Sequence, residues 1–225
     1  MSQTFSLVDS LSLGDLQVYL GRAARVEDGS VRLIAGSGVL AVYVAVLHPV
    51  GLLDESPTVL GLRTFALAGP DAFDVVVPVR SLIERLARLQ SAITDPTAPV
   101  TVSLPMQVNT VTWAAISPPK GGWTALGGVD GSGLEAVAKA GIDEVATAIP
   151  SGTGEQIVQR VRSEVWGRPI EGLEYIPAGA AFAALSLGFL GGTDAVRIFE
   201  TGPWTRLSTQ RGHVLVKRRA WSLQR

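Results

Sequence analysis

Hydrophobic and polar positions follow two different periods along this chain, and the two periods occupy separate stretches. A spacing of three and four residues predicts a helix that Ser12 caps, with one apolar face made of Leu13, Leu16, Tyr19, Leu20 and Ala23. Four strand-like runs follow at 31–36, 39–47, 58–68 and 73–78, separated by turn signals rich in glycine and proline. Because the links at either end of this group are short, we expect antiparallel pairing.

A second helix and a second group of strands are predicted in the middle of the chain. The helix begins at Pro78 and carries an apolar stripe of Val79, Leu82, Ile83, Leu86 and Leu89. The strand-like runs after it are "VTVSLP", "VNTVTWAAI" and "GWTALGGV". The turn "SPPKGG" would join the last two as a hairpin, with Trp113 and Trp123 in contact across the strands.

Three helices and a final group of strands are predicted in the last hundred residues. The helices start at Ser132, where Glu135 completes a capping box, at Thr153 with Gln156 as its partner, and near Pro177. Strands at 195–200, 204–209 and 213–218 close the chain as a meander. Strands in runs followed by helices in runs predict an α+β fold, with antiparallel sheets packed against about five helices and a C-terminal helix before the meander.

The segment "TDPTAP" at 94–99 is the best candidate for a linker. It predicts an N-terminal α+β subdomain at 1–93 and a C-terminal α+β subdomain at 100–225. The alternative is one composite domain.

Composition excludes several kinds of chemistry. The 225 residues include no cysteine, so disulfides, thiolate metal sites and cysteine nucleophiles are impossible. The two histidines have no metal-ligand spacing, and no G-x-S-x-G nucleophile motif occurs. We therefore expect no metal and no cofactor, and we favour a non-catalytic protein over an enzyme.

The glycine-rich stretches do not indicate nucleotide binding. "GSGVLA" at 36–41 resembles a loosened dinucleotide fingerprint, but a strand follows it where the fingerprint requires a helix. The glycine-rich stretch before Ser132 leads into a helix, but the predicted capping box would occupy the N–H groups that an anion needs.

The uncharged run at 33–53 is long enough to span a membrane, but its glycines, its proline and its β-branched residues fit a buried hairpin better. The N-terminus has acids and no basic run, unlike a secretory signal. We therefore predict a cytoplasmic protein without membrane insertion.

Charge is distributed unevenly along the chain. Residues 195–225 hold seven cations and one acid, a formal charge of +6, so the remainder carries −7 to give the net −1. Such a split predicts an acidic protein surface or a second copy, in a homodimer, as the partner. The candidate binding residues are Trp204, Arg206, Ser208, Arg211, His213, Lys217, Arg218 and Arg219.

The function that these patterns favour is a non-catalytic binding or protein–protein interaction module that uses the basic, aromatic C-terminal hairpin. One alternative is a winged-helix-like nucleic-acid-binding regulator, which the overall acidity disfavours. A second alternative is an enzyme acting on a small phosphorylated or acidic substrate, with its site at His48, Asp54, Glu55 and Arg63.

Overall fold

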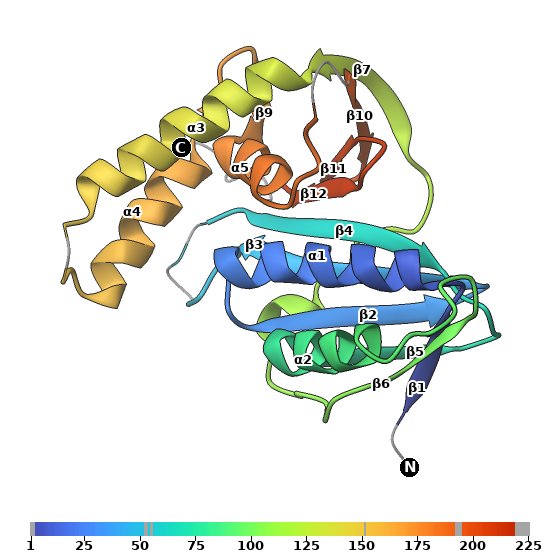
Figure 1. The fold of residues 1–225 in the computed structure, drawn as a ribbon. Coiled ribbons are helices and arrows are strands. Elements are labelled where there is room, and N and C mark those ends of the chain that lie inside the picture. The colour runs from blue at the N-terminus through green and yellow to red at the C-terminus, as the bar shows by residue number, and fades with distance from the viewer. Residues whose placement is uncertain (1–2, 52–53, 55, 151, 192–194, 219–225) are drawn as a thin grey trace. The chain divides into compact units, whose positions relative to one another are not determined.

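The structure is a computed structural model, and it describes residues 3–51, 54, 56–150, 152–191 and 195–218 (Figure 1). Helices and strands alternate in runs, which confirms the predicted α+β class with antiparallel sheets and a closing meander. The elements in chain order are β1 (Thr4–Leu7), α1 (Ser10–Val26), β2 (Ser30–Gly36), β3 (Val39–Leu47), β4 (Thr58–Ala66), β5 (Phe73–Pro78), α2 (Val79–Gln90), β6 (Val100–Ser103), the 3-10 helix η1 (Thr112–Ala115), β7 (Thr124–Asp130), α3 (Gly131–Ala148), α4 (Glu155–Gly167), β8 (Pro169–Ile170), β9 (Leu173–Pro177), α5 (Ala178–Ser186), β10 (Ala195–Thr201), β11 (Trp204–Ser208) and β12 (His213–Lys217).

The chain divides into two compact units. Unit 1 contains residues 1–44 and 62–116, and unit 2 contains 45–61 and 117–225. Strands β3 and β4 therefore contribute residues to both units. The main sheet has the hydrogen-bonded order β5-β2-β3-β4-β12-β11-β10-β7. The predicted linker at 94–99 lies inside unit 1, and the two subdomains stay a prediction.

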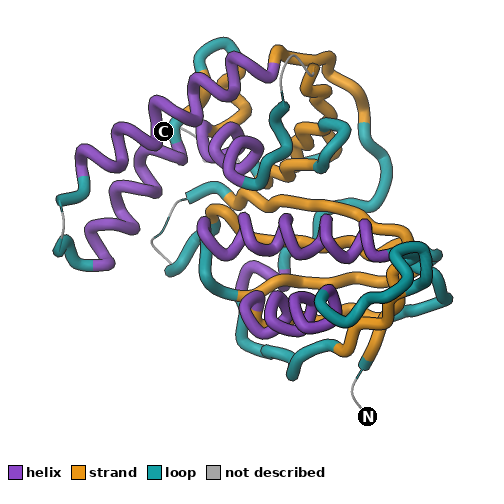
Figure 2. The backbone as a smooth tube through the Cα atoms, viewed as in Figure 1, coloured by secondary structure: helices purple, strands orange, loops and turns teal. Residues whose placement is uncertain are grey.

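Unit 1 is built from a sheet with two helices on one face. Helices α1 and α2 lie side by side over the sheet (Figures 1 and 2), and each contributes the apolar stripe that the sequence predicts. Tyr19 is fully buried, and its hydroxyl donates to the carbonyl of Val42 at 3.4 Å. The turn between β2 and β3 is tight, with positive φ at Ser37 and Gly38, so "GSGVLA" is a hairpin and not a nucleotide loop.

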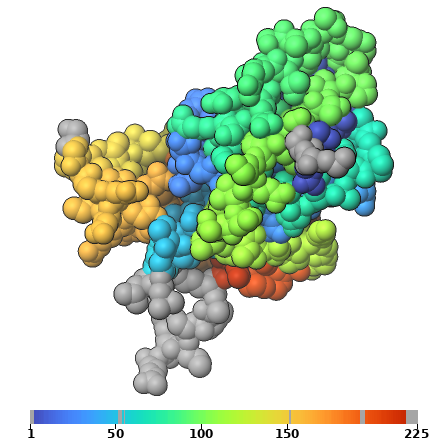
Figure 3. Space-filling model, turned by 90° about the horizontal axis from the view of Figure 1, so that it is seen from below, coloured from blue at the N-terminus to red at the C-terminus, as the bar shows by residue number. Residues whose placement is uncertain are grey.

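A second, two-stranded sheet in unit 1 was not predicted. β1 pairs antiparallel with β6, and Phe5 and Val102 are opposite each other and fully buried. Figure 3 shows the first residues, in dark blue, against green residues from the second half of unit 1. The pairing joins residues about a hundred positions apart, and no local pattern encodes such a contact.

Unit 2 contains three helices, of which α5 packs against β12 and α3 contacts β7, while α4 packs on α3 and α5. Helix α3 contacts both α4 and α5, and the Trp166 ring of α4 stacks on Phe182 of α5 with ring centroids 4.3 Å apart. Gly141 of α3 lies against that tryptophan, where a side chain would overlap the ring. The small residues of α3 and α5 thus serve close helix packing.

All three predicted caps at Ser12, Ser132 and Thr153 are wrong. Helix α4 begins at Glu155 after Gly154, and the Thr153 hydroxyl donates to the Pro150 carbonyl and does not cap the helix. The α1 cap is Asp9, whose carboxylate accepts from the Ser12 N–H at 2.7 Å. The α3 cap is Asp130, which accepts from both the N–H and the hydroxyl of Ser132. Glu135 pairs instead with Lys139, one turn further along. An aspartate that precedes the helix competes with the predicted cap for the same N–H donors.

The predicted hairpin around "SPPKGG" is also wrong. Trp113 lies in η1, and β7 pairs antiparallel with β10 from much later in the chain. Trp123 instead contacts Arg206 of β11. The strand propensity of the 108–116 run did not decide its structure, because pairing depends on which strand is accessible in the fold.

The uncharged run at 33–53 contributes to β2 and β3. Among the described residues, none of the helices combines the length and the apolar character needed to cross a membrane.

Candidate functional site

The hairpin of β11 and β12 is largely covered on both faces. The register places Arg206 opposite Leu215 and Ser208 opposite His213, as the alternation predicts. However, Trp204 and Ser208 are only 4% and 9% exposed. The two strands are inner strands of the sheet, between β4 and β10, so neighbours cover what the pattern alone suggests is a solvated face.

Arg206 is held between two aromatic rings. Its guanidinium carbon lies 4.5 Å from the ring centroid of Trp123 and 4.6 Å from that of Phe199, while Arg197 lies 5.3 Å from Phe199. Burial, and then the charge of Arg197, lower the pKa of Arg206. The Nε atom of Arg206 is buried and has no hydrogen-bond partner in the described part of the chain. We call Arg197, Arg206, Trp123 and Phe199 the arginine–aromatic cluster.

His213 forms a structural pair with Ser208. Its Nδ1 lies 2.9 Å from the Ser208 hydroxyl oxygen. Burial, and then the charge of Arg206, lower the pKa of His213, so the imidazole is neutral near pH 7. A neutral, half-buried ring beside a buried hydroxyl satisfies two polar groups inside the fold.

The remaining cations of the predicted site are spread along the end of the hairpin. Arg218 pairs with Glu200 at 3.4 Å and donates to the Gly202 carbonyl at 2.7 Å. Lys217 and Arg211 are exposed. Arg219 lies outside the described residues. The fold therefore compensates part of the C-terminal charge internally.

The alternative small-ligand site stays a prediction, and its described residues make local contacts. Asp54 accepts from the Val50 N–H and from the N–H and hydroxyl of Ser56. Burial acts to raise the pKa of Asp54, but these hydrogen bonds, led by the Ser56 hydroxyl, lower it overall. His48 contacts the carbonyl of Pro49, and Arg63, in unit 1, pairs with Asp15 at 2.6 Å. Glu55 lies outside the described residues.

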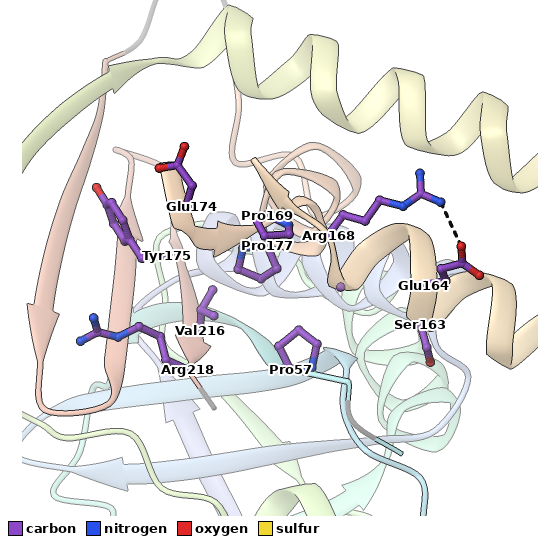
Figure 4. A pocket seen from close by; sticks show the side chains of 11 residues that line it. Pro57, Ser163, Glu164, Arg168, Pro169, Glu174, Tyr175, Pro177, Val216 and Arg218 are labelled. Carbon is purple, nitrogen blue, oxygen red and sulfur yellow. Dashed lines mark hydrogen bonds and ion pairs between the residues drawn. The ribbon is translucent and has the colours of Figure 1, made fainter. Parts of the chain in front are cut away.

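The geometry favours a different place, an open pocket of about 830 Å³ in unit 2 (Figure 4). It lies where α4, the β8–β9 hairpin and the end of β12 meet. Its lining is Pro57, Ser163, Glu164, Gly167, Arg168, Pro169, Glu174, Tyr175, Pro177, Val216 and Arg218.

This pocket has an apolar floor and charged ends. Three prolines and Val216 form its apolar part, while Tyr175 and Arg218 lie at one end and Arg168 at the other (Figure 4). Arg168 is held by Glu144 at 2.7 Å and by Glu164 at 3.4 Å. A floor of this kind with polar groups at its rim suits a peptide or a small organic ligand.

Of the predicted binding residues, only Arg218 belongs to this pocket. The β8–β9 hairpin that carries Tyr175 was missed, although Glu171-Gly172 is a turn signal, and Gly172 has a φ of 76°. The other lining residues come from separate stretches of chain, which only the fold brings together. The described residues contain no group of three or more histidine, aspartate or glutamate side chains that could hold a metal ion.

The chain matches two families along its sequence. Residues 1–106 match a domain of unknown function, DUF8010, and residues 118–221 match another, DUF8185. No curated protein matches the chain.

The fold is similar to that of several solved structures. The chain is similar to Caulobacter crescentus pol III beta, with a TM-score of 0.52, 12% identity and coverage of 98% of this chain and 67% of that one. The chain is also similar to the sliding clamp of Bartonella birtlesii, a DNA polymerase III subunit beta bound to griselimycin, with a TM-score of 0.52 and 13% identity over 98% of this chain and 66% of that one. It is similar to the Borrelia burgdorferi DNA polymerase III subunit beta, in complex with a natural product, with a TM-score of 0.54 and 7% identity over 99% of this chain and 66% of that one.

The fold is therefore that of a sliding clamp, and the chain spans about two thirds of the length of these proteins. This finding corrects the predicted function. The interaction module centred on the C-terminal hairpin is wrong, because the hairpin is an inner part of a clamp-like sheet. The winged-helix alternative is wrong as well, because the match to the clamp fold covers nearly the whole chain and leaves no separate winged-helix domain.

Proposed function

We propose that this protein is a clamp-like scaffold that associates with itself and with duplex DNA and that holds a partner protein there. The observation that carries the proposal is the similarity to sliding clamps over 98–99% of the chain at TM-scores above 0.5. The identities are too low to transfer a function by themselves, so the charges of this chain provide the second support.

The surface that suits DNA best is the helix pair of unit 1. Helices α1 and α2 carry five arginines against Asp15 and Glu84, a net charge of +3. Helices α3 and α4 together carry three cations against five acids. Arg25 and Arg88 are exposed in the last turns of α1 and α2. Exposed arginines on adjacent helices attract phosphates without reading base sequence.

The partner protein would use the pocket of unit 2. Its apolar floor suits the hydrophobic side chains of an extended segment, and the polar groups at its ends, including Tyr175, can hydrogen-bond to the backbone of that segment. Self-association into a homodimer and location in the cytoplasm stay predictions of the sequence.

Native mass spectrometry of the full chain, alone and with a short DNA duplex, tests the proposal. We expect a homo-oligomer that takes up duplex as an intact assembly. A chain that stays monomeric and takes up no duplex at low salt contradicts it. If the chain is a monomer that still binds duplex, only the self-association part of the proposal is wrong.

A further inference from the structure

We propose that the edge strand β7 binds an extended acidic segment of a partner protein as an additional strand, with Arg197 of the arginine–aromatic cluster holding its carboxylates. This site is separate from the helix pair and from the pocket, and it does not depend on the proposed function.

Strand β7 ends the main sheet. It pairs with β10 along one edge, and no described strand lies along its other edge. Its first five residues are all exposed, and Leu126 retains 44% of its surface. A bulge interrupts the pairing with β10 between Ile198 and Phe199. The free edge presents backbone N–H and C=O groups that an extended peptide can pair with.

The strand has little of the side-chain protection that sheet edges usually have. Exposed edges are normally guarded by lysine, by proline, by inward-pointing charges or by a bulge, and β7 has a bulge at Leu126. The sequence of β7, "TALGGVD", contains one charged residue, Asp130, which is held by Ser132 as the cap of α3. The edge therefore has no guarding lysine, proline or inward-pointing charge, and its backbone groups outside the bulge remain able to pair with an added strand.

Cations lie beside this edge on one face of the sheet. Arg197 of β10 is exposed and lies opposite Gly128 of β7, so no side chain on β7 separates it from the edge. Arg206 is the next cation on the same face, oriented by Trp123 and Phe199. None of the ion pairs of the described residues involves either arginine.

The acid nearest to Arg197 along β10 does not neutralise it. Side chains alternate between the two faces of a strand, and Glu200 is three residues from Arg197, so Glu200 lies on the other face, where it pairs with Arg218. The register also places Asp130, opposite Ala195, on the face of Arg197, but the N–H and hydroxyl of Ser132 donate to this carboxylate. Arg197 suits a further oxyanion at the edge, and Arg206 adds to the positive charge of the face. Aspartate or glutamate at alternate positions of an added strand supplies such an oxyanion.

A second copy of β7 fits this edge less well. A two-fold pairing of β7 strands would bring Arg197 and Arg206 of both copies to the same face, against one Asp130 carboxylate from each copy. Nucleic acid fits poorly as well, because phosphates cannot pair with the alternating donors and acceptors of a strand edge. The charge of the edge therefore favours an acidic peptide.

The test uses a fluorescein-labelled peptide of alternating glutamate and valine, titrated with the full chain and followed by anisotropy. Two further peptides of the same charge carry N-methyl groups on the odd or on the even residues, which blocks pairing through one edge of the peptide. We expect the parent peptide to bind, one N-methylated form to bind much more weakly, and hydrogen exchange to slow in residues 124–130.

Two matched charge reversals test the role of the cluster. Arg197→Glu should weaken binding about tenfold or more, because repulsion replaces attraction at the edge. Arg160→Glu, the same change at an exposed position of α4, should leave binding within about twofold. Circular dichroism establishes that both variants fold.

Three results overturn the inference. They are equal binding of all three peptides, equal weakening in the two variants, and a native dimer that Leu126→Pro dissociates. The last result would assign the edge to a second copy.

Discussion

At the scale of single residues, the contacts that define the chemistry of this protein join positions far apart in the chain. Arg206 looks in the sequence like one more exposed cation, and the fold turns it into a stacked guanidinium between Trp123 and Phe199. His213 similarly becomes a neutral partner of Ser208. The residue types are visible in the sequence, but the neighbours that define their chemistry are not.

Gly141 provides a prediction at this scale. A Cβ atom there would lie 2.7 Å from Cη2 of Trp166, in a ring already stacked on Phe182. We expect Gly141→Ala to lower the free energy of unfolding by about 1–3 kcal/mol, despite the better helix propensity of alanine. Urea denaturation measures the change.

The matched control is Gly133→Ala in the same helix. A Cβ atom at Gly133 would have no neighbouring atom within 4 Å, and the glycine has an ordinary helical backbone. The substitution should be neutral or stabilising by a few tenths of a kcal/mol, roughly the helix propensity difference. Equal destabilisation in the two variants would mean that the clash with Trp166 does not decide the effect.

At the scale of elements, periodicity locates helices and strands well, while their ends and pairing partners depend on other forces. The apolar stripe of α1 coincides with its buried residues, and the final meander lies where alternation places it. The predicted caps at Ser12 and Ser132 are wrong because several polar residues near each of these ends compete for the same N–H groups, and Asp9 and Asp130 have the better geometry.

The cap of α1 gives the prediction at this scale. Asp9→Ala leaves the Ser12 N–H without its acceptor and should lower Tm by about 2–4 °C. Asp9→Asn keeps an oxygen acceptor and should lower Tm much less. Thermal unfolding of both variants measures the difference, and a similar decrease in both would show that the charge, rather than the hydrogen bond, is what stabilises α1.

At the scale of the whole molecule, net positive charge lies on particular helices and does not follow the basic C-terminal end of the sequence. The sequence predicts a basic C-terminus, but the fold pairs Arg218 with Glu200 and leaves a net positive charge on α1 and α2. The net charge of −1 therefore conceals a basic helix pair. A clamp-like protein with such a pair should bind DNA in a manner that salt weakens.

Salt dependence gives the prediction at this scale. Replacing Arg25 and Arg88 together by glutamine should weaken duplex binding and reduce the slope of log affinity against log salt, by about 0.9 for each phosphate that is no longer neutralised. The control replaces Arg160 and Arg162 of α4 in the same way and should leave the slope unchanged. A slope that falls equally in both variants would place the DNA elsewhere on the molecule.

The sequence by itself determined the α+β class, most of the helices and strands, and the absence of cysteine chemistry, because these follow from local periodicity and composition. Only the tertiary structure decided that β7 pairs with β10, that β1 pairs with β6, and that the C-terminal hairpin is an inner part of the sheet. Strand order depends on burial and hydrogen bonding between distant segments. For that reason the pocket around Tyr175 and the cations beside the β7 edge could be recognised only once the chain was folded.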